Sequence, residues 1–85
     1  MPIVEIYVKT TCPYCWRAKH LLDSKGVDYT EIHVDFGGTE RVTMIQRANG
    51  RMTVPQIFIA GRHIGGCDDL MVLERQGKLD ELFAL

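Results

Sequence analysis

The stretch that decides the fold is Thr10-Thr11-Cys12-Pro13-Tyr14-Cys15-Trp16, residues 10–16 of the chain. Residues 3–8 precede it, and their alternation of branched or aromatic side chains with others predicts a strand. After it, apolar residues recur at helical spacing from Cys15 to Leu22, and Gly26 marks the predicted end of a helix. The two cysteines therefore lie where a strand passes directly into a helix.

The middle of the chain repeats this order of elements. Alternation over residues 27–35 predicts a second strand, and Gly37-Gly38 separates that strand from the next element. Residues 39–48 predict a short helix with Val42 and Ile45 turned inward. The first half of the chain is thus expected to run strand, helix, strand, helix.

The remainder predicts a hairpin and a helical end. Residues 56–59 and 62–64 are expected to form two strands joined by the tight turn Ala60-Gly61. A helix is expected to open at Cys67, with a last helical turn or two beyond Gly77. The order β-α-β-α-β-β-α predicts a single α/β domain over residues 1–85, with a four-stranded mixed sheet flanked by helices.

Composition narrows the class of protein. With 85 residues, 46% of them hydrophobic and 25% charged, the chain suits one compact domain. A net charge of −1 produces no field that would attract nucleic acid or an anionic membrane, so neither is an expected partner. The apolar stretches are too short to span a bilayer, and the N-terminus lacks the features of a signal peptide. We therefore expect a cytoplasmic protein.

Cys12 has the surroundings that favour a thiolate. It lies at the predicted start of a helix, where unpaired backbone N–H groups and the helix dipole favour an anion. The first turn contains no acidic residue, whereas Lys9, Arg17 and Lys19 lie near it in the sequence. Cysteines in such settings have pKa values of about 3.5–7.5, against about 8.5 for a free thiol. Cys12 is therefore the predicted nucleophile.

Cys15 is the predicted second redox cysteine. It follows Cys12 by one helical turn on the same face, within reach of a mixed disulfide formed on Cys12. Half of a zinc site is the alternative, but zinc needs four ligands and the sequence has no second Cys-x-x-Cys and no His-x-x-x-His. Two inert buried cysteines are a further alternative. No metal is expected, and Cys67 is predicted to be a small buried residue rather than a third redox centre.

Three segments together resemble a glutaredoxin: Cys12-Pro13-Tyr14-Cys15, Thr53-Val54-Pro55 and Gly65-Gly66-Cys67-Asp68-Asp69. The resemblance covers essentially the whole chain and is greatest to the small bacterial dithiol glutaredoxins. It implies a thioredoxin fold and glutathione as the co-substrate, held across the three segments.

The resemblance also implies which residues contact glutathione. They are Lys9, Tyr14, Arg41, Thr53, Val54, Pro55, Gly66, Cys67 and Asp68. Pro55 would be a cis-proline that leaves the backbone of Val54 free to pair with the peptide, and Asp68 would meet the γ-glutamyl ammonium. Asp68 and Asp69 equally fit helix caps, and residues 53–55 equally fit a strand entry.

The other residues singled out have plainer interpretations. The three histidines, at positions 20, 33 and 63, lack metal-ligand spacing and are expected at the surface. Trp16 fits either packing against the helix or contact with a partner. Met52 has no role that we can assign from the sequence.

The implied reaction passes glutathione through Cys12. Cys12 would attack a glutathionylated substrate and take up the glutathione, which a second glutathione would remove; for protein disulfides Cys15 would resolve the intermediate.

Expected partners are disulfide-containing or glutathionylated proteins, with ribonucleotide reductase as one example, and the chain is expected to be a monomer. One rival is an electron donor served by thioredoxin reductase. The other is an iron–sulfur carrier in which two chains bridge a cluster, although Pro13 and Tyr14 resemble the dithiol branch.

Overall fold

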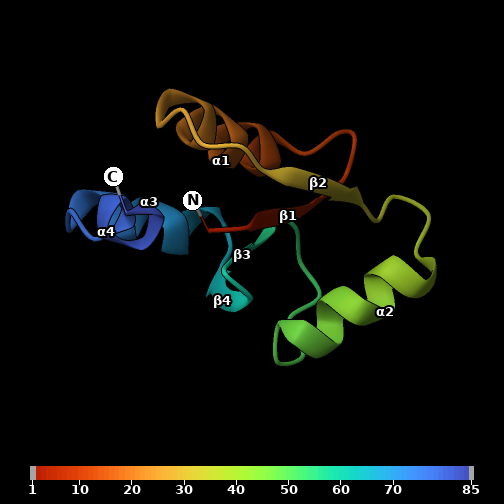
Figure 1. The fold of residues 1–85 in the computed structure, drawn as a ribbon. Coiled ribbons are helices and arrows are strands. Elements are labelled where there is room, and N and C mark those ends of the chain that lie inside the picture. Colours follow the sequence, from red (N-terminus) through yellow and green to blue (C-terminus); the bar gives the residue numbers. More distant parts are fainter. Residues whose placement is uncertain (1, 85) are drawn as a thin grey trace.

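A computed structural model describes residues 2–84, which form a four-stranded sheet with helices on both faces (Figure 1). The elements are β1 (Val4–Val8), α1 (Pro13–Ser24), β2 (Thr30–His33), α2 (Gly38–Arg47), β3 (Gln56–Ile59), β4 (Arg62–Gly65), α3 (Cys67–Arg75) and α4 (Leu79–Phe83). The strand order is β2-β1-β3-β4, with β1 and β2 parallel and the other pairs antiparallel. The predicted mixed sheet and order of elements are confirmed.

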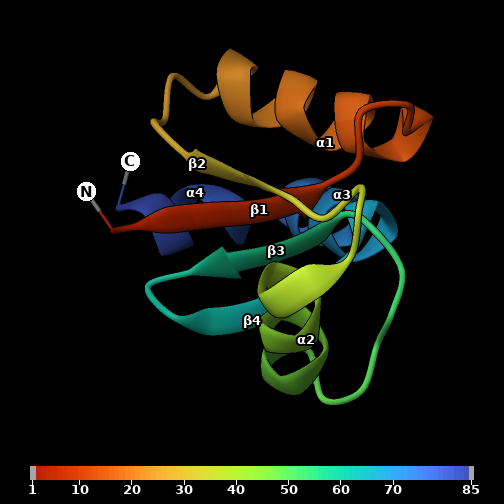
Figure 2. The same cartoon turned by 90° about the vertical axis from the view of Figure 1, so that its right-hand side faces the viewer.

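Alternation along β1 builds two separate cores. Val4, Ile6 and Val8 point to one face, where they pack with buried residues of α1, α3 and α4. Tyr7 points to the other face, toward α2. Figure 2 shows the result, with α2 in front of the sheet and α3 and α4 behind it. Successive side chains of a strand point to opposite faces, so one alternating strand contributes to both layers.

Strand register brings together segments that are distant in the sequence. β1 and β3 run antiparallel, and Tyr7 near the end of β1 pairs with Gln56 at the start of β3. The residues that follow β1 and those that precede β3 consequently meet at one edge of the sheet. This register places the loop containing Cys12 beside Val54, whose carbonyl oxygen lies 3.9 Å from the Cys12 sulfur.

Two expectations about the second quarter of the chain are wrong in detail. In α2, Val42 is 54% exposed and Met44 is the buried residue, with Ile45 packed partly against the same core and Ala48 buried directly after the helix. Met44 and Ala48 share a face because they are four residues apart, whereas Val42 lies more than half a turn away from Met44. The predicted strand over residues 27–35 is also too long, since β2 covers only Thr30–His33.

Arg47 anchors the end of α2 to β1. Its guanidinium contacts both carboxylate oxygens of Glu5, at 2.7 and 3.2 Å, and donates to the hydroxyl of Tyr7 at 3.0 Å. The same group lies 4.0 Å from the centre of the Phe58 ring. The bond to Glu5 raises the pKa of Arg47, so it remains charged. Arg47 thus combines a bidentate ion pair with stacking, which lysine cannot reproduce.

We expect Arg47→Lys to destabilise the fold by about 1–2 kcal/mol, because it loses the fork geometry and the stacked contact. Urea unfolding followed by circular dichroism measures this. Lys19→Met is the control, since it removes the exposed Lys19–Glu31 pair and should change stability by less than about 1 kcal/mol. Equal effects of the two substitutions would contradict an anchoring role for Arg47.

Candidate active site

Cys12 is the residue at which α1 begins. It has an extended backbone, Pro13 is the first helical residue, and the first turn carries no acidic side chain. The backbone N–H of Cys15 donates to the Cys12 sulfur at 3.2 Å. A sulfur in this position receives both a hydrogen bond and the positive end of the helix dipole, which stabilise a thiolate when the cysteines are reduced.

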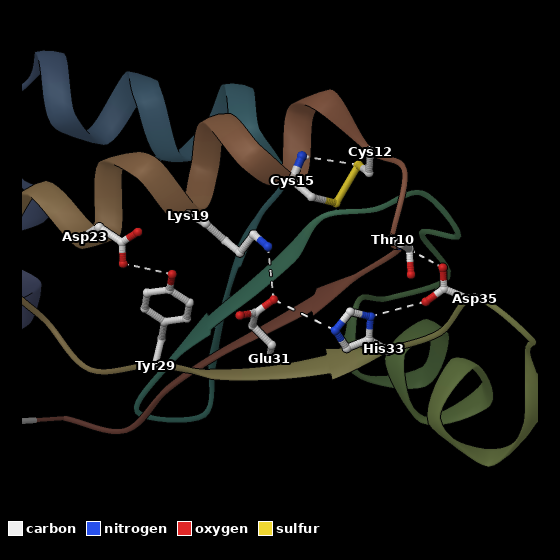
Figure 3. Close-up of polar contacts among 9 residues, drawn as sticks. All are labelled: Thr10, Cys12, Cys15, Lys19, Asp23, Tyr29, Glu31, His33 and Asp35. Atoms are coloured by element: carbon white, nitrogen blue, oxygen red, sulfur yellow. Dashed lines mark hydrogen bonds and ion pairs between the residues drawn. A yellow bond between two sulfur atoms is a disulfide. The ribbon is translucent and has the colours of Figure 1, made fainter.

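The two cysteines differ in accessibility. They are joined as a disulfide at the start of α1, with their Cα atoms 5.2 Å apart (Figure 3). Cys12 is 9% exposed, whereas Cys15 is completely buried under the first turn. Cys12 is therefore the more accessible of the two cysteines to an external thiol or disulfide. This difference supports Cys12 as the attacking residue and Cys15 as the resolving one.

A pocket of about 270 Å³ lies beside these cysteines. Its walls come from the first turn of α1, the loop before β3 and the start of α3, and the Val54–Pro55 peptide bond in the loop is cis. The lining residues are Tyr14, Arg51, Thr53, Val54, Pro55, Gly66, Cys67, Asp68 and Asp69. The structure thus brings together the three segments on which the family resemblance rests.

The pocket does not include every residue that the resemblance implied. Lys9 is exposed on the loop after β1 and Arg41 is half-buried on α2, and neither lines the pocket. Conversely, Arg51 and Asp69 line it and were not among the implied glutathione contacts, although Asp69 belongs to the third segment of the resemblance. Trp16 is 63% exposed and is therefore not a core residue.

Asp69 and Arg51 connect two walls of the pocket. One oxygen of the Asp69 carboxylate accepts the backbone N–H of Gly66 at 2.8 Å and lies 2.9 Å from the Arg51 guanidinium. The Gly66 N–H, followed by the Arg51 contact, lowers the pKa of Asp69. Asp69 rather than Asp68 therefore caps α3, and Asp68 is exposed. Its spacing of three residues from Gly66 is that of a capping box, whereas Arg51 carries no comparable sequence signal.

A polar chain holds the loop before Cys12 in place (Figure 3). The backbone N–H of Thr10 donates to Asp35 at 2.6 Å, and the other oxygen of Asp35 lies 3.2 Å from His33. Glu31 continues the chain, 3.9 Å from His33 and 3.0 Å from Lys19 on α1. The Thr10 N–H lowers the pKa of Asp35, so the acceptor stays ionised. These contacts tie α1 and the loop before it to β2 and the loop after it.

Cys67 is a free thiol at the start of α3 and is only 4% exposed. Burial raises its pKa, which keeps it protonated at neutral pH. We expect iodoacetamide to alkylate Cys12 in the reduced, folded protein and to leave Cys67 unmodified until guanidinium chloride unfolds the chain. Peptide mapping by mass spectrometry checks this. Equal modification of Cys12 and Cys67 in the folded state would contradict it.

The histidines and other polar groups offer no metal site within residues 2–84, where no group of three or more His, Cys, Asp or Glu side chains could hold an ion. Across the same residues, no helix is both long and apolar enough to cross a bilayer.

His20 and His33 are exposed as expected, but His63 is half-buried beside Phe58. The centres of the His63 and Phe58 rings lie 5.1 Å apart.

Comparisons with known proteins agree with this geometry. A family model described as Glutaredoxin matches residues 4–64. Glutaredoxin 3 of Escherichia coli is 58% identical over 82 residues, which cover 96% of this chain and 98% of that protein. A glutaredoxin of Pseudomonas aeruginosa is 55% identical over 84 residues, which cover 99% of each.

Solved structures show the same likeness. A buckwheat glutaredoxin–glutathione complex has a TM-score of 0.85 and 38% identity, covering 95% of this chain and 76% of that one. The solution structure of a glutaredoxin from Brucella melitensis has a TM-score of 0.83 and 51% identity, covering 96% of this chain and 88% of that one.

Proposed function

Because this chain belongs to the glutaredoxin family and is a thiol–disulfide oxidoreductase, we propose that it uses glutathione to reduce glutathione mixed disulfides and protein disulfides. One observation carries this proposal. The pocket beside Cys12 joins the cis-proline segment to the start of α3. A peptide lying in it would have its sulfur near Cys12 and a carboxylate near the backbone N–H groups of that helix start.

The reaction of a mixed disulfide begins at Cys12. Its thiolate attacks the glutathione sulfur, the substrate thiolate leaves and takes a proton, and glutathione remains on Cys12 as a new disulfide. A second glutathione thiolate then attacks that glutathione sulfur. Oxidised glutathione leaves, and the Cys12 thiolate is regenerated. The Cys15 N–H and the helix dipole stabilise Cys12 as the leaving group in this last step.

Protein disulfides follow a route through both cysteines. Cys12 attacks one sulfur of the substrate disulfide and forms a mixed disulfide with the protein. Cys15 then attacks Cys12, which releases the reduced substrate and leaves the Cys12–Cys15 disulfide. Two glutathiones reduce that disulfide in turn. The 5.2 Å separation of the two Cα atoms supports this closure.

Glutathione is proposed to lie along the pocket in one direction. Its cysteine part would pair with the backbone of Val54, in the manner of an added strand. Its γ-glutamyl part would place a carboxylate on the backbone N–H groups of Cys67 and Asp68, since that of Gly66 is bonded to Asp69, with its ammonium on the Asp68 side chain. Tyr14, Thr53 and Pro55 would line the groove. Because Lys9 and Arg41 lie outside the pocket, the glycine carboxylate would have to extend beyond its rim to reach them.

The test is to mix the reduced protein with oxidised glutathione and to locate the products by mass spectrometry. We expect a glutathione adduct on Cys12 and an intramolecular Cys12–Cys15 disulfide. Coupled assays with glutathione reductase and with thioredoxin reductase then identify the electron donor. Turnover with thioredoxin reductase alone, or an adduct confined to Cys67, would overturn the proposal.

The physiological setting is part of the same proposal. Disulfide-containing and glutathionylated proteins are the proposed substrates, with ribonucleotide reductase among the candidates. We place the reaction in the cytoplasm, where thiols are kept reduced, and expect the chain to act as a monomer. Gel filtration of the reduced protein checks the oligomeric state.

A further inference from the structure

Gln56 is a polar side chain buried completely at the start of β3. Burying an amide without hydrogen bonds costs a few kcal/mol, so its presence there requires specific partners. Its nitrogen donates to the carbonyl oxygen of Thr53 at 3.0 Å and to the Thr53 hydroxyl at 3.3 Å. Its oxygen lies 2.7 Å from Nε2 of His63 on β4. Gln56 therefore links the neighbouring strand to the pocket wall.

Chemistry fixes the direction of each of these bonds. A backbone carbonyl can only accept, so the nitrogen of Gln56 must face Thr53 and its oxygen must face His63. His63 must then carry a hydrogen on Nε2 and donate it to Gln56. Burial lowers the pKa of His63, Arg51 lowers it further and Asp69 acts in the opposite direction. The ring is therefore neutral at pH 7, in the form protonated at Nε2.

The bonds act on the segment that borders Cys12. Thr53 and Gln56 stand on either side of Val54–Pro55, so their contact closes a short loop around the cis peptide. The Thr53 hydroxyl already accepts a hydrogen bond from Gln56, and its own hydrogen is left for another acceptor. Thr53 lines the pocket, where a bound peptide offers carbonyl and carboxylate oxygens.

We propose that Gln56, oriented by His63, is a positioning residue: it holds the Thr53–Pro55 segment and leaves the Thr53 hydroxyl as a hydrogen-bond donor to the bound peptide. The inference rests on the proposed function, because Thr53 is one of the proposed glutathione contacts. Neither Gln56 nor His63 lines the pocket, and both act through Thr53. Their effect should therefore be on binding and not on the chemistry at Cys12.

The first test is steady-state kinetics of Gln56→Met, which keeps the volume of the side chain and removes its hydrogen bonds. With glutathione and a small glutathione mixed disulfide, we expect KM for glutathione to rise about fivefold to tenfold. The value of kcat should change by less than about twofold, because none of the hydrogen bonds of Gln56 is made to Cys12 or Cys15. Gln46→Met, at an exposed position of α2, is the matched control and should change neither constant.

A double-mutant cycle shows whether Gln56 acts through Thr53. In a Thr53→Val background, Gln56→Met should raise KM by a smaller factor than it does in the parent. His63→Phe keeps a ring against Phe58 and removes the hydrogen-bond donor to Gln56, so it should also raise KM for glutathione. It replaces Gln56→Met in this test if Gln56→Met does not fold. An unchanged KM in folded variants, or an equal factor in both backgrounds, would overturn the proposal.

Nuclear magnetic resonance separates this inference from the proposed function, because it needs no glutathione. In the parent protein we expect slow solvent exchange of the Gln56 side-chain amide and nitrogen shifts of a neutral His63 protonated at Nε2. A His63 ring protonated only at Nδ1 could not donate to Gln56 and would overturn the proposal. If the hydrogen bonds of Gln56 to His63 and Thr53 are present but the parent protein does not use glutathione, the proposed function is wrong and the positioning of Thr53 by Gln56 is not.

Discussion

Replacing Cys12 with serine is expected to abolish reduction of both a glutathione mixed disulfide and a protein disulfide. A serine hydroxyl is not ionised at the helix start at neutral pH and cannot form the mixed disulfide through which both routes pass. Cys15→Ser should keep turnover of the glutathione mixed disulfide, because that route needs Cys12 alone. It should lose most of the reduction of protein disulfides, for which Cys15 is the resolving thiol.

Parallel assays of both variants with the two substrates and glutathione reductase measure these separate roles of Cys12 and Cys15. Circular dichroism of each variant controls for folding, and mass spectrometry should find glutathione on Cys12 in the Cys15→Ser protein. The reverse pattern, with Cys12→Ser active on the mixed disulfide and Cys15→Ser inactive, would show that the two roles are exchanged. The burial difference between the two sulfurs favours Cys12 as the attacking residue.

Gly65→Ala is expected to be the most destabilising single substitution at the pocket. Gly65 ends β4 with φ at +120°, a conformation that side-chain-bearing residues rarely adopt. An added Cβ would collide with the carboxylate of Asp69 and would lie 2.9 Å from the Arg51 guanidinium. Displacing Asp69 removes the cap of α3 as well as its ion pair. Backbone strain and the lost cap together should cost about 2–4 kcal/mol.

Gly61→Ala is the matched control for this substitution. Gly61 also has a positive φ, +77°, but an added Cβ would meet no atom within 4 Å. Its cost should be limited to backbone strain, about 1–2 kcal/mol. Urea unfolding of both variants compares them, and Gly65→Ala should also raise KM for glutathione because the start of α3 lines the pocket. Equal losses of stability would contradict the role assigned to Asp69.

The elements were predictable where one local pattern dominated. Alternation in β1, the Ala60-Gly61 turn of the hairpin and the helical spacing after Cys12 each led to an element that the structure contains. The inward face of α2 was not predictable in the same way. Val42 and Met44 are both apolar, and only the packing of Met44 against the sheet distinguishes the buried position from the exposed one.

The residues of the candidate site fall into the same two groups, those that a local pattern predicts and those that only the structure reveals. Cys12 and Cys15 lie within one helical turn and were identified from their spacing, and the family resemblance led to residues of the two other segments. Asp69 was identified as part of the third segment and as a possible helix cap, whereas Arg51 and the buried Gln56 were not identified. Arg51 and Gln56 depend on partners on other segments, Asp69 and His63, and nothing in the sequence around them specifies those partners.

The chemistry of one sulfur is set locally in the chain. Helix-start geometry, a proline in the first turn and the absence of acidic neighbours act within a few residues of Cys12, so they can be recognised without knowledge of the fold. The place where a peptide could lie against that sulfur depends instead on contacts between distant segments. The pocket exists because the antiparallel register of β1 and β3 brings Thr53–Pro55 to Cys12, and long-range packing against α1 brings the start of α3 to the same place.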